Sequence, residues 1–269
     1  LTETQIAGVQ ESARTELKAG VVAIQGASLK LSVTMVGTPV EYAAPAVVRG
    51  AVAGLALLDK NDTALKSGAV EAIVGTSFKA LKGNTEGLPS TALEGLATTM
   101  AGGAVAKLSA AGFPSDAVST ATKSVTAGSI ANLQAAGIDS SVVKDVAKAV
   151  VTGAVTQLAA IDLPADHIAA AVAGATEGAV SSITATGLSA ENTVELAGTL
   201  TAASVQTLTV FKDIGQTALV SAMQQISTSA VAALSTAKID SSSLGPAVKS
   251  IASASVAAVA VVSEQAGLG

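Results

Sequence analysis

The residues that could carry out catalysis or bind a metal are few and lie far apart in the chain. His167 is the only histidine and follows Asp166, and the sequence contains no cysteine. A catalytic triad needs a nucleophile, a base and an orienting acid, and a zinc site needs three or four protein ligands. One histidine satisfies neither requirement. We therefore interpret Asp166 as a helix cap and His167 as an exposed residue of the first turn.

Other short patterns that resemble binding sites lack essential members. The stretch from Asp59 to Asp62 begins like a calcium loop, but the glycine and the distal glutamate of such a loop are missing. Gly102 and Gly103 are not followed by the Lys and Ser/Thr of a phosphate-binding loop. Single acidic residues occur on predicted helices at Glu94, Glu177 and Glu195. We expect no catalytic residue, metal, cofactor or small-molecule substrate, and therefore a protein that is not an enzyme.

The composition limits which partners the chain can bind and what kind of core it can form. The net charge is −5, the 15 Lys and Arg residues are scattered, and aromatic residues make up 1% of the chain. Nucleic-acid binding relies on clustered cations and on aromatic stacking, so we expect no nucleic-acid partner. Without cysteine the chain has no disulfides. Ala, Gly, Ser, Thr and Val dominate, so stability must come from many close backbone contacts.

An internal repeat explains how these small residues are arranged. Two small residues followed by a larger apolar residue return about every 25 positions, as in Gly50-Ala51-Val52. We call the third residue of each tripeptide the anchor. The anchors are Val52, Phe78, Val105, Ile130, Val155, Val180, Val205, Val231 and Val256. A fixed period of this length indicates a stack of similar structural units.

One unit reads as one helix between two turns. In residues 116–140, Ser115 and Asp116 offer a helix cap, and Gly137 occupies the position where a left-handed residue ends a helix. We predict one helix of about 20 residues, since no proline interrupts the span. The alternative is a break near the central glycine that gives two short helices. Short turns make successive helices antiparallel.

The predicted fold is all-α, with tandem helical repeats of about 25 residues stacked up and down in an α-solenoid-like array. Residues 41–269 would hold about nine repeats. Residues 1–40 fit less well, and we interpret them as an atypical N-terminal segment, with an amphipathic helix over Thr4–Lys18 followed by a loop. Terminal segments of repeat proteins often cap the stack or engage a neighbour.

The glycines of the repeat indicate close contact between helices. Each glycine inside a helix costs about 1 kcal/mol relative to alanine, and tight packing of successive helices is the simplest reason to keep it. The residues predicted to make these contacts are Gly103, Val105, Gly128, Ile130, Gly153, Val155, Gly178, Val180, Val205, Val231 and Val256. We expect small side chains to mediate the packing throughout.

The two ends of such a stack would expose apolar helix faces, which favours self-assembly. The candidate assembly faces are Val47, Val48, Val52 and Leu55 at one end and Val256, Val259, Val261 and Val262 at the other. We expect a structural protein that forms a homopolymeric filament, sheath or surface layer. Two alternatives stay open. One is a helical-repeat scaffold that binds other proteins, and the other is an amphipathic coat on lipid, a granule or another interface.

Two further expectations concern location. The sequence begins at Leu1 rather than Met, and its low charge and its Ser/Thr-rich polar face favour a processed chain that is extracellular or at the cell surface. Membrane insertion is not expected. The most apolar stretch, Leu244 to Val262, contains Pro246 and Lys249 and is diluted by serine.

Overall fold

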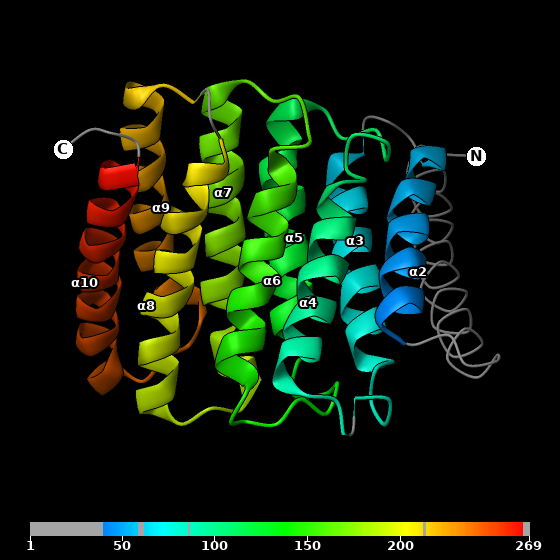
Figure 1. Ribbon diagram of the computed structural model, residues 1–269, viewed down its shortest axis with the longest axis horizontal. Coiled ribbons are helices and arrows are strands. Elements are labelled where there is room, and N and C mark those ends of the chain that lie inside the picture. The colour runs from blue at the N-terminus through cyan, green and yellow to red at the C-terminus, as the bar shows by residue number, and fades with distance from the viewer. Residues whose placement is uncertain (1–39, 59–61, 86, 212–213, 266–269) are drawn as a thin grey trace, which may run out of the picture.

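The computed structural model describes residues 40–58, 62–85, 87–211 and 214–265, and within these ranges the regular elements are all helices (Figure 1). The all-α class is therefore confirmed, while the predicted helix over Thr4–Lys18 lies outside the described residues. The α-helices are α2 (Val40–Gly54), α3 (Thr63–Lys79), α4 (Ser90–Val105), α5 (Val118–Ile130), α6 (Val143–Leu158), α7 (Ala165–Ser181), α8 (Ala190–Thr207), α9 (Gln216–Thr236) and α10 (Ser241–Gln265). Short 3-10 turns are η1 (Leu55–Leu57), η2 (Ser115–Ala117), η3 (Ile183–Thr186) and η4 (Leu208–Val210).

Each anchor lies in a single α-helix, so the alternative of two short helices per unit is wrong for the described helices. The helix of the unit considered above, α5, is nevertheless shorter than predicted, with 13 residues rather than about 20. After Ile130 the backbone tightens, and the amides of Asn132 and Leu133 donate to carbonyls three residues back. Such bonds satisfy carbonyl groups that the end of an α-helix leaves free.

The predicted turn at Gly137 is confirmed, whereas the predicted cap is not. Gly137 has a φ of 80°, and the amide of Ile138 donates to the carbonyl of Leu133 at 3.2 Å, as in a glycine-terminated helix. No side chain caps the first turn of α5, which is preceded instead by η2. The residue before η2 is Pro114, in an extended conformation, and its carbonyl accepts from the amide of Ala117 at 2.9 Å.

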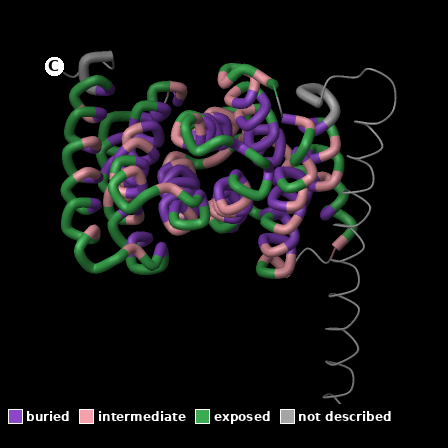
Figure 2. Tube along the Cα trace, turned by 90° about the horizontal axis from the view of Figure 1, so that it is seen from below, coloured by how far each residue is buried: buried purple, intermediate pink, exposed green. Residues whose placement is uncertain are grey.

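The helices lie in two layers. One layer contains α2, α4, α6, α8 and α10, and the other contains α3, α5, α7 and α9 (Figure 1). The largest contacts join helices that are two apart in the chain, such as α4 with α6 and α7 with α9. Buried residues gather where the helices face one another, and the last helix is largely exposed (Figure 2).

Helices two apart run in the same direction and in one register. Thr98 donates to the carbonyl of Ala149 at 3.3 Å, and Ser119 donates to the carbonyl of Ala170 at 2.7 Å. The ammonium of Lys144 pairs with the carboxylate of Glu195 at 2.7 Å. In all three cases the partners are 51 positions apart. Along one pair, α5 and α7, Cβ atoms built on Gly174 and Gly178 would meet the carbonyl oxygens of Ser119 and Lys123, each 55 positions earlier. The separation is the same one turn further along, so the two axes are parallel; along an antiparallel pair it would change.

The closest backbone contacts also occur within a layer. A Cβ built on Gly128 would come within 2.6 Å of the carbonyl oxygen of Glu71 on α3. Cβ atoms on Gly153 and Gly178 would collide in the same way with the carbonyl oxygens of Thr98 on α4 and Lys123 on α5. The expectation that successive helices make the tightest contacts is therefore wrong, because the glycines face the helix two positions earlier. The prediction that small residues allow close packing holds at these glycines.

Buried hydroxyl groups are accommodated without long side chains. Ser129 donates to the carbonyl of Val125 at 2.8 Å, and Thr201 donates to that of Ala197 at 2.8 Å, each one turn back in its own helix. Thr176 on α7 also donates to the hydroxyl of Ser204 on α8 at 2.7 Å. A buried hydroxyl is costly only when it lacks a partner, so these residues fill the interior at little cost.

We predict that adding one methyl group at an interhelical glycine destabilises the protein. Gly153→Ala should lower the free energy of unfolding by about 1–3 kcal/mol, because α4 and α6 must move apart. Gly95→Ala is the matched control, since no atom lies within 4 Å of a Cβ built on Gly95. That change should raise stability by about 0.5–1 kcal/mol through helix propensity. Urea unfolding followed by circular dichroism measures both, and equal effects would contradict the close-contact role of Gly153.

Candidate assembly surface

The titratable residues of the described chain do not gather into a metal site. No group of three or more His, Asp or Glu side chains in these residues could hold a metal ion. The Nε2 atom of His167 lies 3.9 Å from the carboxylate of Asp166, and its Nδ1 atom is buried without a hydrogen-bond partner in the structure. His167 is half-buried rather than fully exposed, with 32% of its side chain accessible. No nucleophile is described beside this pair.

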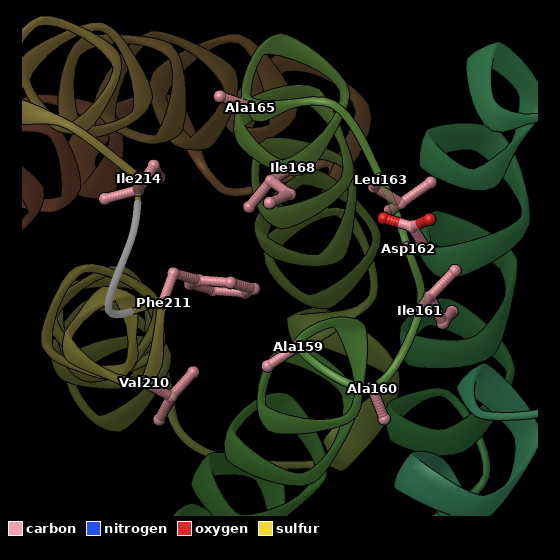
Figure 3. Close-up of a pocket in the computed structure, with 10 residues that line it drawn as sticks. All are labelled: Ala159, Ala160, Ile161, Asp162, Leu163, Ala165, Ile168, Val210, Phe211 and Ile214. Atoms are coloured by element: carbon pink, nitrogen blue, oxygen red, sulfur yellow. The ribbon is translucent and has the colours of Figure 1, made fainter.

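Apart from Asp162, the residues that line the larger groove have apolar side chains, but polar atoms of the backbone and of Asp162 also reach its surface. It has a volume of about 570 Å³ and lies between the α6–α7 turn and the α8–α9 turn. The ring of Phe211 projects into it, near Ala159 and Ile168 (Figure 3). Asp162 is the only charged residue among those that line it. No second titratable residue is found among its described lining residues.

A smaller groove of about 370 Å³ lies between α3 and α5. Gly75 and Gly128 form its floor together with Asn132, and Glu71 and Lys79 stand at its edge. The amide of Asn132 donates to the carbonyl of Gly128 at 2.7 Å. Glu71 and Lys79 are exposed, and the groove lies where Gly75 and Gly128 let the two helices approach closely.

The residues predicted to pack divide into two sets. Those from Gly103 to Val205 are all buried: Gly103, Val105, Gly128, Ile130, Gly153, Val155, Gly178, Val180 and Val205. Val231 on α9 and Val256 on α10 are 40% and 72% exposed. Both are anchors, and all seven earlier anchors are at most 1% exposed. The last helix of each layer therefore presents to solvent a position that is covered on every earlier helix.

The assembly face predicted near the N-terminal end lies mostly inside the protein. Val48, Val52 and Leu55 are buried, and Val47 is half-buried. These side chains pack within the molecule because α2 turns them toward its neighbours α3 and α4. An apolar cluster in sequence does not reveal which side of a helix is covered. What α2 does expose includes small residues, such as Gly50.

The face predicted near the C-terminal end is partly open. Val256 and Val261 are exposed, Val259 is half-buried, and Val262 is buried against the protein. Further exposed apolar residues, which the sequence analysis did not identify, are Leu244 and Val248 on α10 and Val220 on α9. Leu244 and Val248 are four residues apart on α10, and Val220 and Val231 are eleven residues apart, about three turns, on α9, so each pair shares a side of its helix. This spacing was the available signal. We call Val220, Val231, Leu244, Val248, Val256 and Val261 the C-terminal face.

One apolar helix in the described chain is long enough to cross a membrane. It covers Ser241–Val262, with a mean hydropathy of 1.6, and 28% of its apolar window is buried. Core helices of soluble proteins meet the same length and composition test. The helix is part of α10, and its buried side packs against α8 and α9.

Lys66 is a buried charge that the sequence analysis missed. Its side chain is 1% exposed, and its ammonium donates to the carbonyl of Ala111 at 2.9 Å. The ammonium also lies 5.9 Å from the centre of the Phe113 ring. A cation over an aromatic face is stabilised by the ring electrons. Lys66 at the start of α3 therefore holds the turn between α4 and α5.

We predict that the long stem of Lys66 matters more than its charge. Lys66→Met should change the free energy of unfolding by no more than about 1 kcal/mol, because an apolar side chain of similar volume often replaces a buried charge at little cost. Lys66→Ala should lose about 2–4 kcal/mol by leaving a cavity. Chemical denaturation measures both variants. If the methionine variant is as unstable as the alanine variant, the ammonium contacts hold the turn.

Comparison with known proteins adds no assignment to this geometry. No protein-family model matches the chain, and no curated protein sequence matches it significantly.

Proposed function

We propose that this protein is a structural subunit that assembles with copies of itself. The observation that carries the proposal is the exposure of Val231 and Val256, whose counterparts on earlier helices are all covered by protein. Large exposed apolar patches mark interaction surfaces. In the interior, helices of this same chain cover the equivalent positions, so a further helix of the same kind fits the C-terminal face.

The proposal includes the finer architecture, a tandem-repeat array of the α-solenoid kind. Three contacts with one separation of 51 positions support it, because they relate different helix pairs by the same offset. In such arrays each unit contacts only its neighbours, so the ends stay open unless they are capped. The proposed product is a filament, sheath or surface layer, outside the cell or on its surface.

A coat on lipid or another interface is the second candidate. The exposed apolar side of α10 favours it, since Leu244, Val248 and Val256 would suit an apolar phase. Interfacial helices usually carry Lys or Arg along the polar side, and α10 has Lys249 alone. Flotation with phosphatidylcholine vesicles separates the candidates. Binding that Val256→Glu abolishes would favour the coat over self-assembly.

We predict that charge on the C-terminal face prevents assembly. The wild-type protein should form oligomers that grow with concentration, and the Val231→Glu/Val256→Glu variant should stay monomeric, because burying two unpaired carboxylates is costly. Sedimentation velocity and negative-stain electron microscopy provide the measurements.

The matched control carries Thr120→Glu and Gln206→Glu, which add the same charge at exposed positions on α5 and α8. This control should assemble like the wild-type protein. A wild-type protein that is monomeric at high concentration, without fibres, would contradict the proposed function.

A further inference from the structure

A glycine on α2 lacks the neighbour that its counterparts have. Gly50 stands two positions before the anchor Val52, as Gly128 and Gly153 do before theirs. Each of those glycines faces a backbone carbonyl of the helix two positions earlier. Among the described residues, no atom lies within 4 Å of a Cβ built on Gly50, and Gly50 is exposed. As α2 is the first described helix of its layer, no described helix occupies the position before it.

The partners of Gly128, Gly153 and Gly178 occupy one fixed place on their helices, whereas Gly103 on α4 meets the side chain of Arg49 on α2. Glu71, Thr98 and Lys123 are the residues whose carbonyl oxygens approach Gly128, Gly153 and Gly178. Each of the three stands seven positions before the anchor of its own helix. The last helix of the layer, α10, has the anchor Val256, and the residue seven positions before it is Lys249. Lys249 is exposed.

We propose that copies of this chain join head to tail, with α2 of one copy parallel to α10 of the next and Gly50 seated against the backbone carbonyl of Lys249. This inference rests on the proposed self-assembly and specifies its geometry. The joint repeats the packing of α6 on α4, so α2 of the incoming copy covers the exposed anchor Val256. The two surfaces complement each other, because one has open space beside Gly50 and the other has projecting valine side chains. Two copies of the same surface would not fit together in this way.

The assembly that follows is open rather than closed. A head-to-tail joint is heterologous, because the two copies contribute different surfaces. Each added copy leaves a free C-terminal face at one end and a free α2 at the other. Since the joint continues the packing inside the subunit, the filament would run along the long axis of Figure 1.

Cross-linking through introduced cysteines tests the register, because the chain has no cysteine of its own. Inside the protein, Thr98 and Ala149 are in hydrogen-bond contact and stand seven and six positions before their anchors. The equivalent residues across the joint are Lys249 of one copy and Ala46 of the next, both exposed. A mixture of Lys249→Cys and Ala46→Cys proteins, oxidised with copper phenanthroline, should give a disulfide-linked dimer that contains one of each.

The controls separate this geometry from the proposed function. Lys249→Cys alone and Ala46→Cys alone should stay unlinked, and the protein with both changes should give a ladder of linked chains. If Lys249→Cys alone links efficiently, the copies meet tail to tail, which overturns the head-to-tail joint but keeps self-assembly. If sedimentation shows only monomers, the proposed function itself fails. Assembly without the mixed link overturns the register.

A second variant tests the open space beside Gly50 and needs no introduced cysteine. Gly50→Leu should abolish assembly, because the added side chain fills the space that the neighbouring carbonyl needs. Gly95→Leu is the control, since Gly95 is also an exposed helix glycine with free space around it. Both variants should keep the helical circular dichroism of the wild-type protein. Assembly that survives Gly50→Leu would overturn the proposed contact.

Discussion

The contact of a glycine with a neighbouring backbone carbonyl is the constraint on which this fold depends. Gly128, Gly153 and Gly178 let helices two apart in the chain approach more closely than a side chain would allow. At these contacts the helices touch along their backbones, while larger side chains such as Phe78, Met100 and Ile130 fill the space elsewhere in the core. Dispersion between closely packed atoms takes the place of the large apolar areas that bulky side chains would bury.

The same approach explains why the interior tolerates so many hydroxyl groups. When two backbones are close, only Ala, Ser, Thr, Val or Gly fits between them. The hydroxyls of Ser129 and Thr201 return to their own helices, so the neighbouring helix meets little more than methyl-sized surface. A few hydroxyls, such as that of Ser119, instead bond across to the next helix of the layer. Small polar and small apolar residues of similar volume can therefore occupy the same kind of interior position.

The sequence predicted the helices and several of their ends, because the residues that begin and end a helix act on the backbone only a few positions away. Gly137 is left-handed, as a helix-terminating glycine should be, and one helix surrounds each anchor. The layer arrangement could not be predicted in the same way. A period of about 25 residues is equally compatible with tight packing between consecutive helices and between helices two apart. Only side-chain bonds such as that from Thr98 to Ala149 reveal which pairing occurs.

The sequence predicted the candidate surface only in part, because the exposure of an apolar residue depends on contacts with helices that are distant in the chain. The sequence identified Val256 as part of an open face but placed Val48 and Val52 on one as well, although both are buried. An apolar side chain favours a buried position, but whether it is buried depends on which helices pack next to it. Lys66 was missed for the opposite reason, since a lone lysine near a helix start is usually exposed and its partner Ala111 lies 45 positions away.

The offset of 51 positions between bonded partners has a consequence for how the chain can change in length. If one span of that length, one helix from each layer, were removed or duplicated, the helices on either side would still meet complementary partners. An insertion or deletion of another length inside a helix would shift that helix out of phase with the one it contacts. Evolution or design could therefore lengthen this molecule in steps of two helices, one added to each layer.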